Sequence, residues 1–334
     1  MNRLLALSVH LTQWRSVRHL VRRQHGRDPN GAWALPFQIL DRHLSADRYD
    51  SPDLEPLAAL LPGGQGRLFS AILQAMAARD TSPLDAIVRD RQAHIETRFE
   101  AMGWALFLAR RATCGRGNPP AAVMQFWDRN PPREIDAARR AWRDRYRDAY
   151  AFCDADAAGA FVEQHHGPAM RRRFDAAWHP ALKADIFRLA WLSVAGGLYV
   201  DADMKPGTAI LARSRTAAVS ATNVPRCCVT TGILFGTGAD RIWTGFLEAI
   251  MRDLDPAKPA PINGLSGPAA LTRFLYLNPD LAAGIDLFPY RQARQRIARQ
   301  FDAGYKYTPQ NWRVFEHGQG LDDAGFYTRL AAEL

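Results

Sequence analysis

The sequence predicts an α/β fold preceded by an α-helical region, and three observations support this prediction. Apolar residues recur at spacings of three and four through the first part of the chain, which is typical of helices. After residue 120, short apolar runs alternate with such helical stretches, which indicates a largely parallel sheet. A turn-rich stretch at 114–120 (CGRGNPP) separates the two patterns. We therefore expect a helical region over residues 1–115 and an α/β domain over residues 116–334.

The N-terminal region is expected to hold three helices. The first spans residues 4–23 and ends before His25-Gly26, and the second spans 65–78, after a Pro-Gly-Gly turn. The third spans 83–111, and this length predicts a kink near Gly103. Four arginines of the first helix would suit an anionic lipid surface. This region therefore either docks on a membrane or braces the rest of the chain.

Strands and helices alternate in the second region. We expect strands at 121–127, 150–153 and 198–200, and helices at 132–146, 157–164 and 183–195. Gly196-Gly197 should end the last of these helices, since glycine accepts left-handed backbone angles. The strand at 198–200 then delivers Asp201-Ala202-Asp203 to its carboxyl end.

Composition narrows the class of protein. Hydrophobic residues make up 47% and charged residues 23% of the 334 residues, as in ordinary soluble proteins. The net charge of +9 would suit nucleic acid, an acidic membrane or a phosphate-bearing ligand. The arginines are scattered and no nucleic-acid motif surrounds them, so we expect no nucleic-acid partner.

The expected location is cytoplasmic, with peripheral contact at the inner face of the membrane through the first helix. No stretch reaches the roughly 18–20 apolar residues that a membrane span needs. The N-terminus has no small-residue cleavage site and is read as an amphipathic helix. The 4 cysteines form no Cys-x-x-Cys pattern, which favours free thiols in a reducing compartment.

Two carboxylates, Asp201 and Asp203, are the main candidates for chemistry. In open α/β sheets, ligands bind beyond the carboxyl ends of the strands. If the strand continued, both side chains would point to one side, roughly 7 Å apart. Such a pair suits a divalent cation that carries a diphosphate on its other side. Asp185 and Arg188 lie three residues apart on one helical face nearby.

An isolated Asp-x-Asp is a weak signal, because the pattern is common in loops and helix caps. A second copy, Asp154-Ala155-Asp156, follows the strand at 150–153, and we expect no function for it. The pair Asp201 and Asp203 stands out because a helix with Asp-x-x-Arg, a Gly-Gly stop and a short strand precede it.

This whole string, residues 180–206 (PALKADIFRLAWLSVAGGLYVDADMKP), resembles the signature of glycosyltransferase family 32, the glycosyltransferases with a DXD-containing sugar-binding region. Large glucosylating bacterial toxins share a similar core. Residues 123–127 (VMQFW) resemble the opening strand of the family, and 267–272 (GPAALT) resemble a later segment. The resemblance covers roughly residues 118–290. It implies a GT-A-like, Rossmann-type domain that binds a nucleotide-sugar.

The resemblance also implies a ligand set. The donor would be a UDP- or GDP-sugar, and the cofactor a divalent metal, Mn²⁺ or alternatively Mg²⁺. Trp127 would stack on the base, Asp185 would accept hydrogen bonds from sugar hydroxyls, and Arg188 would bind sugar or phosphate oxygens. Asp201 would contact the ribose and the metal shell, and Asp203 would bind the metal directly. The structural alternatives are a buried Trp127 and a helix-surface ion pair between Asp185 and Arg188.

The chain departs from the family pattern at two places. Thr230-Thr231 stand where family members often have an asparagine. The family tends to end in a His-rich segment that closes over the metal, whereas this tail reads Asn311-Trp312-Arg313-Val314-Phe315-Glu316-His317-Gly318. His317 is the candidate for a metal ligand there, and a structural or exposed histidine is the alternative.

The function that the resemblance implies is a retaining hexosyltransferase. It would act by front-side attack on a glycan acceptor, in bacterial surface polysaccharide or lipopolysaccharide biosynthesis. Two alternatives remain open, namely a toxin-like enzyme that modifies a protein side chain and a non-catalytic nucleotide-sugar-binding protein. The residues do not choose the donor sugar or the acceptor.

Overall fold

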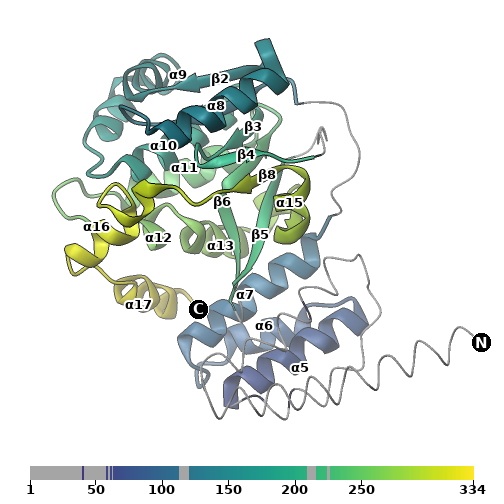
Figure 1. The fold of residues 1–334 in the computed structure, drawn as a ribbon. Helices are drawn as coiled ribbons and strands as arrows, with labels where there is room; N and C mark the ends of the chain where they lie inside the picture. Colours follow the sequence, from purple (N-terminus) through teal and green to yellow (C-terminus); the bar gives the residue numbers. More distant parts are fainter. Residues whose placement is uncertain are drawn as a thin grey trace, which may run out of the picture. The chain divides into compact units, whose positions relative to one another are not determined.

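The computed structural model describes residues 63–112, 120–208, 216–223 and 226–334, together with Leu40, Ala58 and Leu61. The chain separates into two compact units. Unit 1 holds Met1–Ala109 with Thr222–Cys227, and unit 2 holds Arg110–Ala221 with Cys228–Leu334 (Figure 1). The expected helix at 4–23 lies outside the described residues. The division into domains at 115 and 116 stays a prediction.

Unit 1 contains α5 (Gly63–Ala78), α6 (Ser82–Arg89) and all but the last residue of α7 (Ile95–Arg110). The helix expected at 65–78 is confirmed, but the single helix expected at 83–111 is wrong. Asp90 ends α6, because its side chain accepts from the backbone of Gln92 at 2.9 Å and its carbonyl accepts from Ala93 at 3.0 Å. Gly103 causes no break in α7. A Cβ there would lie 1.7 Å from the carbonyl oxygen of Cys227, so only glycine permits this approach.

Unit 2 is built on a sheet of six strands in the order β2-β1-β3-β6-β5-β7. β1 runs parallel to both β2 and β3, and β5 runs parallel to β7. β6 runs antiparallel to β3, which the sequence did not reveal. The strands are β1 (Val123–Phe126), β2 (Tyr150–Cys153), β3 (Gly197–Val200), β5 (Ala217–Asn223), β6 (Arg226–Gly236) and β7 (Asp286–Pro289). The α/β class is confirmed, and the arrangement agrees with a GT-A-like domain.

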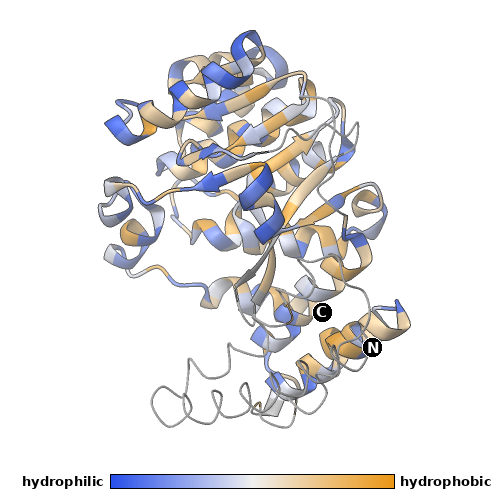
Figure 2. Cartoon of the chain, turned by 45° about the vertical axis from the view of Figure 1, so that its right-hand side comes forward, coloured by the Kyte–Doolittle hydropathy of each residue, from blue (hydrophilic) through white to orange (hydrophobic). Residues whose placement is uncertain are grey.

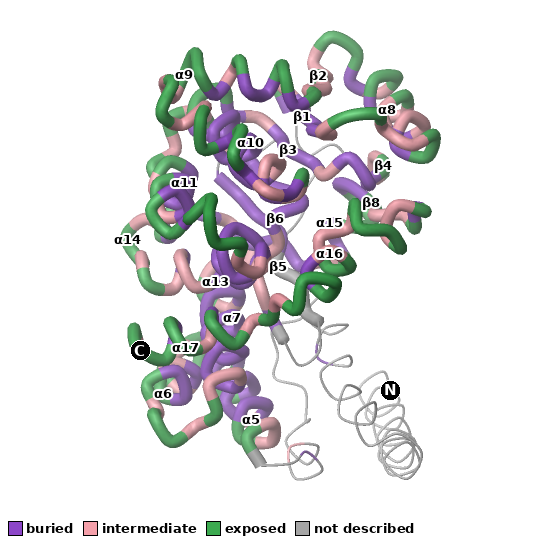
Figure 3. The backbone as a smooth tube through the Cα atoms, turned by 90° about the vertical axis from the view of Figure 1, so that its left-hand side faces the viewer, coloured by how far each residue is buried: buried purple, intermediate pink, exposed green. Residues whose placement is uncertain are grey.

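Helices cover both faces of this sheet. α9, α10 and α11 lie on one face, whereas α8, α15 and a separate antiparallel pair, β4 and β8, lie on the other (Figure 3). The remaining bounds are α8 (Arg133–Tyr146), α9 (Ala155–Asp175), α10 (Pro180–Val194), α11 (Arg241–Asp253), α12 (Ile262–Leu265), α13 (Pro268–Leu277), α14 (Pro279–Ala282), α15 (Tyr290–Arg296), α16 (Trp312–Gly318), α17 (Ala324–Glu333), β4 (Met204–Pro206), β8 (Ala298–Gln300) and the 3₁₀ helices η1 (Arg147–Ala149) and η2 (Gly304–Tyr307).

The core of unit 2 follows from alternation along the strands. On the α8 face, Leu198 and Val200 of β3 pack in one buried cluster with Trp142 of α8 and Ile297 beside α15. On the other face, the ring of Phe126 contacts those of Phe174 and Phe187 in α9 and α10. Figure 2 shows the same contrast, with hydrophobic colour along the central strands and hydrophilic colour on the outer helices.

The connection from α10 to β3 positions the residues that the sequence singled out. His179 caps the start of α10, because its Nδ1 accepts from the backbone of Ala181 at 3.0 Å. Gly196 and Gly197 have φ values of 66° and 96°, so they end α10 as expected and turn the chain into β3. The expected helix at 157–164 is the first part of the longer α9, which is kinked at Gly167 before Pro168.

Two further expectations concern the whole chain. Within the described ranges, no helix is long and apolar enough to cross a membrane. Cys153 is a free thiol, as expected, and Cys114 lies outside the described residues.

Candidate functional site

A cleft of about 610 Å³ opens in unit 2 where β1 and β3 end. Trp127 follows β1, and Asp201 and Asp203 follow β3, so the cleft lies at the carboxyl ends of two parallel strands. Asp185 and Arg188 of α10 line it from one side. The segment after β8 lines another side with Tyr305, Lys306, Gln310, Asn311, Trp312 and Arg313.

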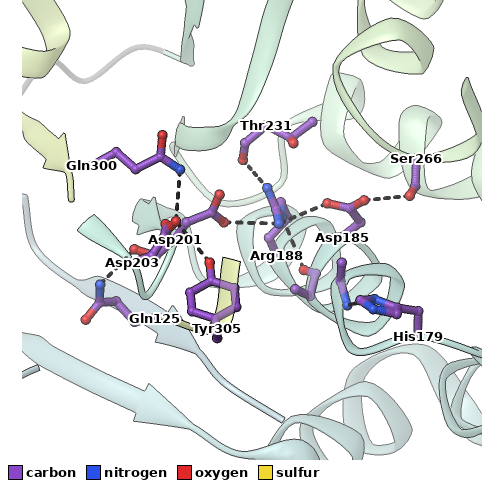
Figure 4. Close-up of polar contacts among 12 residues, drawn as sticks. Gln125, His179, Asp185, Arg188, Asp201, Asp203, Thr231, Ser266, Gln300 and Tyr305 are labelled. Atoms are coloured by element: carbon purple, nitrogen blue, oxygen red, sulfur yellow. Dashed lines mark hydrogen bonds and ion pairs between the residues drawn. The ribbon is translucent and has the colours of Figure 1, made fainter. Parts of the chain in front are cut away.

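Asp185, Arg188 and Asp201 form an ion network, which we call the motif cluster (Figure 4). The side chain of Asp201 is 33% exposed to the cleft. Nη2 of Arg188 lies 2.9 Å from Oδ1 of Asp185 and 3.1 Å from Oδ1 of Asp201. Nη1 of Arg188 donates to the carbonyl oxygen of Thr231, and Nε donates to that of Ala184 at 3.2 Å. Asp185 and Arg188 are each only 4% exposed, so the reading of this pair as a helix-surface ion pair is wrong.

Burial raises the pKa values of the two carboxylates of this cluster. It raises the pKa of Asp185 to about 6, against the lowering effect of Arg188 and of the hydroxyl of Ser266, which donates to Oδ2 at 2.5 Å. Burial also raises the pKa of Asp201, which Arg188 lowers and Asp203 raises. The ring of Tyr199 lies 4.8 Å beneath the guanidinium, and burial raises the pKa of its phenol. Tyr199 is thus a packed core residue, as expected.

A turn, and not a continued strand, connects Asp201 to Asp203. β3 ends at Val200, and the backbone of Met204 donates to the carbonyl of Asp201 at 3.1 Å. The spacing extrapolated from strand geometry therefore does not apply. Asp201 is held from both sides, because its backbone donates to Gly232 at 2.9 Å and its carbonyl accepts from the side chain of Gln125 at 3.0 Å. Gln125 is itself fully buried.

Asp203 is surrounded by donors from the C-terminal part of unit 2. Its Oδ2 accepts from Nε2 of Gln300 at 2.9 Å and from the hydroxyl of Tyr305 at 3.0 Å, and Nζ of Lys306 lies 3.0 Å away (Figure 4 labels the first two). We call Gln300, Tyr305 and Lys306 the tail cluster. Sequence reasoning missed all three, since no local pattern marks them.

The carboxylates leave room for a divalent cation. Within the described ranges, no hydrogen bond is donated to Oδ2 of Asp201 or to Oδ1 of Asp203, and no group of three or more His, Cys, Asp and Glu is arranged to hold a metal. Magnesium-like cations are commonly held by one or two carboxylates plus substrate phosphates. The residues therefore fit a cation that shares a phosphate ligand.

His317 is not brought together with these carboxylates. It lies exposed on α16 and is not among the residues that line the cleft. Trp127, by contrast, is half-buried at the cleft. Its indole N–H donates to the carbonyl of Arg129 at 3.0 Å, and its ring meets that of Tyr305 edge-on at 5.0 Å. The alternative of a fully buried Trp127 is therefore wrong.

The other quoted segments have structural roles that differ. Asp154 caps α9 by accepting from the backbone of Ala157 at 2.9 Å, as the reading of this copy as a helix cap expects. Thr231 lines the cleft and offers its carbonyl to Arg188, whereas the hydroxyl of Thr230 donates to Val219 at 3.0 Å. Gly267 lines the cleft beside Ser266, the donor to Asp185 that the sequence also failed to reveal.

The sequence of this region matches a known family. Residues 131–218 match the family described as the glycosyltransferase sugar-binding region containing a DXD motif, and this range includes Asp185, Arg188, Asp201 and Asp203. No curated protein matches the chain at a significant level. Among solved structures, the chain is similar to one titled "PaToxG Glycosyltransferase", with 12% identity and a TM-score of 0.29 over 70% of this chain and 98% of that chain.

Proposed function

We propose that this chain is a glycosyltransferase that takes a sugar from a nucleotide-sugar donor bound in the cleft at the ends of β1 and β3. One observation carries the proposal. The four charged residues of the region that matches the DXD family, Asp185, Arg188, Asp201 and Asp203, all line this one cleft. Charged side chains are rarely buried unless they are paired or bind ligands, and three of these four are no more than 5% exposed.

The cofactor proposed for this site is a divalent metal, Mn²⁺ or Mg²⁺, held by Asp203 and Asp201. Bound there, it would neutralise the diphosphate that leaves the sugar. Arg188 fixes the carboxylate of Asp201 toward the cleft and adds positive charge near the leaving group. Trp127, at the cleft wall, would stack on the base of a UDP- or GDP-sugar.

The disposition of Asp185 supports a retaining, front-side path. Its Oδ1 is paired with Arg188 and its Oδ2 accepts from Ser266, and both contacts draw off the negative charge that a nucleophile would need. It would instead accept hydrogen bonds from the donor sugar once the cleft is filled. The deprotonation of the acceptor then falls to the leaving diphosphate itself. The acceptor we propose is a glycan of the bacterial surface.

A panel of nucleotide-sugars assayed for nucleotide release with Mn²⁺ tests this proposal. We expect turnover of one donor, reduced about 10²–10³-fold in Asp203→Asn, because electrostatic groups of this kind contribute on that scale. Asp156→Asn is the matched control, since Asp156 belongs to the second Asp-x-Asp and is exposed on α9. NMR of the released or transferred sugar checks its anomeric configuration.

Each result has a definite meaning. Metal-dependent turnover with retained configuration supports the proposal as stated. Turnover with an inverted product would exclude the front-side path and keep the enzyme class. Donor binding without turnover against glycan and protein acceptors would favour the non-catalytic binding protein, and an absence of donor binding would overturn the proposal.

A further inference from the structure

Lys306 is paired with Asp203, the carboxylate that is proposed to hold the metal. Its Nζ lies 3.0 Å from Oδ2 of Asp203 and donates to the carbonyl of Phe301 at 2.6 Å. The side chain lines the cleft and is 20% exposed, whereas that of Asp203 is 6% exposed. An ammonium group has three donors, and these two contacts leave one N–H for a ligand in the cleft.

Arg188 uses more of its hydrogen-bond donors within the protein than Lys306 does. Of its five donors, four are used, on Asp185, Asp201, Thr231 and Ala184. The guanidinium is also 4% exposed and stacked over Tyr199. Between these two cations of the described site, Lys306 is therefore the one that can change partners without breaking a buried network.

The turn that carries Lys306 does not depend on its ion pair. The backbone of Lys306 donates to Ala303 at 3.0 Å, and its carbonyl accepts from the side chain of Asn311 at 2.8 Å. The flexible four-carbon stem of a lysine can swing while this backbone stays in place. Its ammonium could thus leave Asp203 with no rearrangement of η2.

A divalent cation on Asp203 would repel this ammonium, because like charges a few ångströms apart raise each other's energy steeply in a poorly solvated site. A diphosphate in the cleft would attract it for the same reason. We propose that Lys306 is a diphosphate-binding residue that is stored on Asp203 while the cleft is empty and competes there with the metal. This inference rests on the proposed function, since it names the phosphate groups of the donor as the ligand of Lys306.

The competition is tested with Mn²⁺ alone, by titration of the nucleotide-free protein followed by electron paramagnetic resonance of the free ion. We expect Lys306→Met to bind Mn²⁺ about tenfold more tightly than the wild type, as for a site that is freed from an occupant present about nine-tenths of the time. Lys306→Arg keeps the charge and should bind Mn²⁺ as weakly as the wild type. Lys205→Met is the matched control, because Lys205 is exposed beside Phe301 and does not line the cleft.

The diphosphate half is tested by calorimetry with UDP and GDP in saturating Mn²⁺. We expect Lys306→Met to bind the preferred nucleotide about 10- to 100-fold more weakly, the loss of one charge-assisted hydrogen bond. One substitution would thus tighten the binding of the metal and weaken the binding of the nucleotide. A merely structural lysine would shift both in the same direction, and thermal melting of each variant checks that it is folded.

The outcomes separate this inference from the proposed function. Unchanged or weaker Mn²⁺ binding in Lys306→Met, with normal nucleotide binding, overturns the inference and leaves the glycosyltransferase proposal intact. If Lys306→Met binds Mn²⁺ more tightly but the wild type binds neither UDP nor GDP, the proposed function is overturned. The claim that Lys306 binds a diphosphate is then overturned too, and the claim that Lys306 competes with the metal for Asp203 is supported. Opposite shifts for metal and nucleotide support both.

Discussion

The two walls of the cleft are built in different ways. The motif cluster draws Asp185, Arg188 and Asp201 from seventeen consecutive residues into contact with one another, and buries the first two. The tail cluster brings Gln300, Tyr305 and Lys306 to Asp203 across about a hundred residues of sequence, and Lys306 keeps some exposure to the cleft. The residues of the motif cluster form ion pairs with one another. The residues of the tail cluster all contact one oxygen, Oδ2 of Asp203. Substitutions should therefore cost stability in the motif cluster and change binding in the tail cluster.

The largest effect is expected from Arg188→Met. The variant leaves Asp185 and Asp201 without their shared countercharge, and removing one partner of a buried ion pair destabilises by about 3–5 kcal/mol. Lys306→Met leaves Gln300 and Tyr305 as donors to Asp203, so it should cost only about 1–2 kcal/mol. Urea denaturation followed by tryptophan fluorescence measures both. Equal losses in the two variants would contradict the contrast between the walls.

The second effect is a dependence of stability on pH through Asp185. Burial raises its pKa in the folded protein from 3.8 to about 6, so between these values the folded chain holds a proton that the unfolded chain has lost. The contribution of Asp185 to the free energy of unfolding is therefore greatest below about pH 4, falls as the pH rises to about 6 and is constant above that. The change amounts to about 3 kcal/mol.

Asp185→Asn stays neutral and isolates that contribution. The free energy of unfolding of the wild type, less that of the variant, should decrease as the pH rises from about 4 to about 6.5. Urea denaturation of both proteins at half-unit steps measures it. A difference that stayed constant, or rose with pH, would contradict the assignment of this titration to Asp185.

A smaller effect is expected from Ser266→Ala. The hydroxyl of Ser266 donates to a buried carboxylate at 2.5 Å, and loss of such a bond costs about 1–2 kcal/mol. The variant should also move the pH transition of Asp185 upward, because that hydrogen bond lowers its pKa. Ser193→Ala is the control, since Ser193 is similarly buried on α10 but donates only to the carbonyl of Ala190. Its pH transition should match that of the wild type.

The smallest effect is expected from Tyr305→Phe in the tail cluster. Asp203 keeps Gln300 and Lys306 as partners, so the loss should be about 0.5–1 kcal/mol. Tyr307→Phe is the control, because Tyr307 is 73% exposed and its hydroxyl contacts only Asp302. A cost for Tyr305→Phe that matched Arg188→Met would show that the tail cluster is as cooperative as the motif cluster.

The same contrast explains what the sequence could predict. The strands β1, β2 and β3 and the helix α10 were readable because each is a local apolar run or follows a local apolar period. Prolines on both sides of β1 and the two glycines after α10 also mark where these two elements end. Asp185 and Arg188 were readable for the same reason, since three residues of helix place them on one face. Their burial was not, because it depends on what packs over that face from elsewhere in the chain.

The residues that escaped prediction are those whose roles are defined by distant partners. Ser266 reaches Asp185 across 81 positions, and Tyr305 reaches Asp203 across 102. Gln125 left the one usable signal, a polar residue inside an apolar strand, and its side chain holds the carbonyl of Asp201. The break between α6 and α7 was missed because an Asp-centred turn has no apolar period to mark it.

His179 links the two walls through one ring. Its Nδ1 accepts from the backbone of Ala181 at the start of α10, so Nε2 must carry the hydrogen that reaches the carbonyl of Pro309 at 3.2 Å. Burial lowers the pKa of this imidazole, which keeps it in the neutral form that both bonds need. An asparagine could replace the first bond but is too short for the second. Two hydrogen bonds thus limit which residues can replace His179. A homologue without this histidine would need another contact to hold the segment at Pro309 against α10.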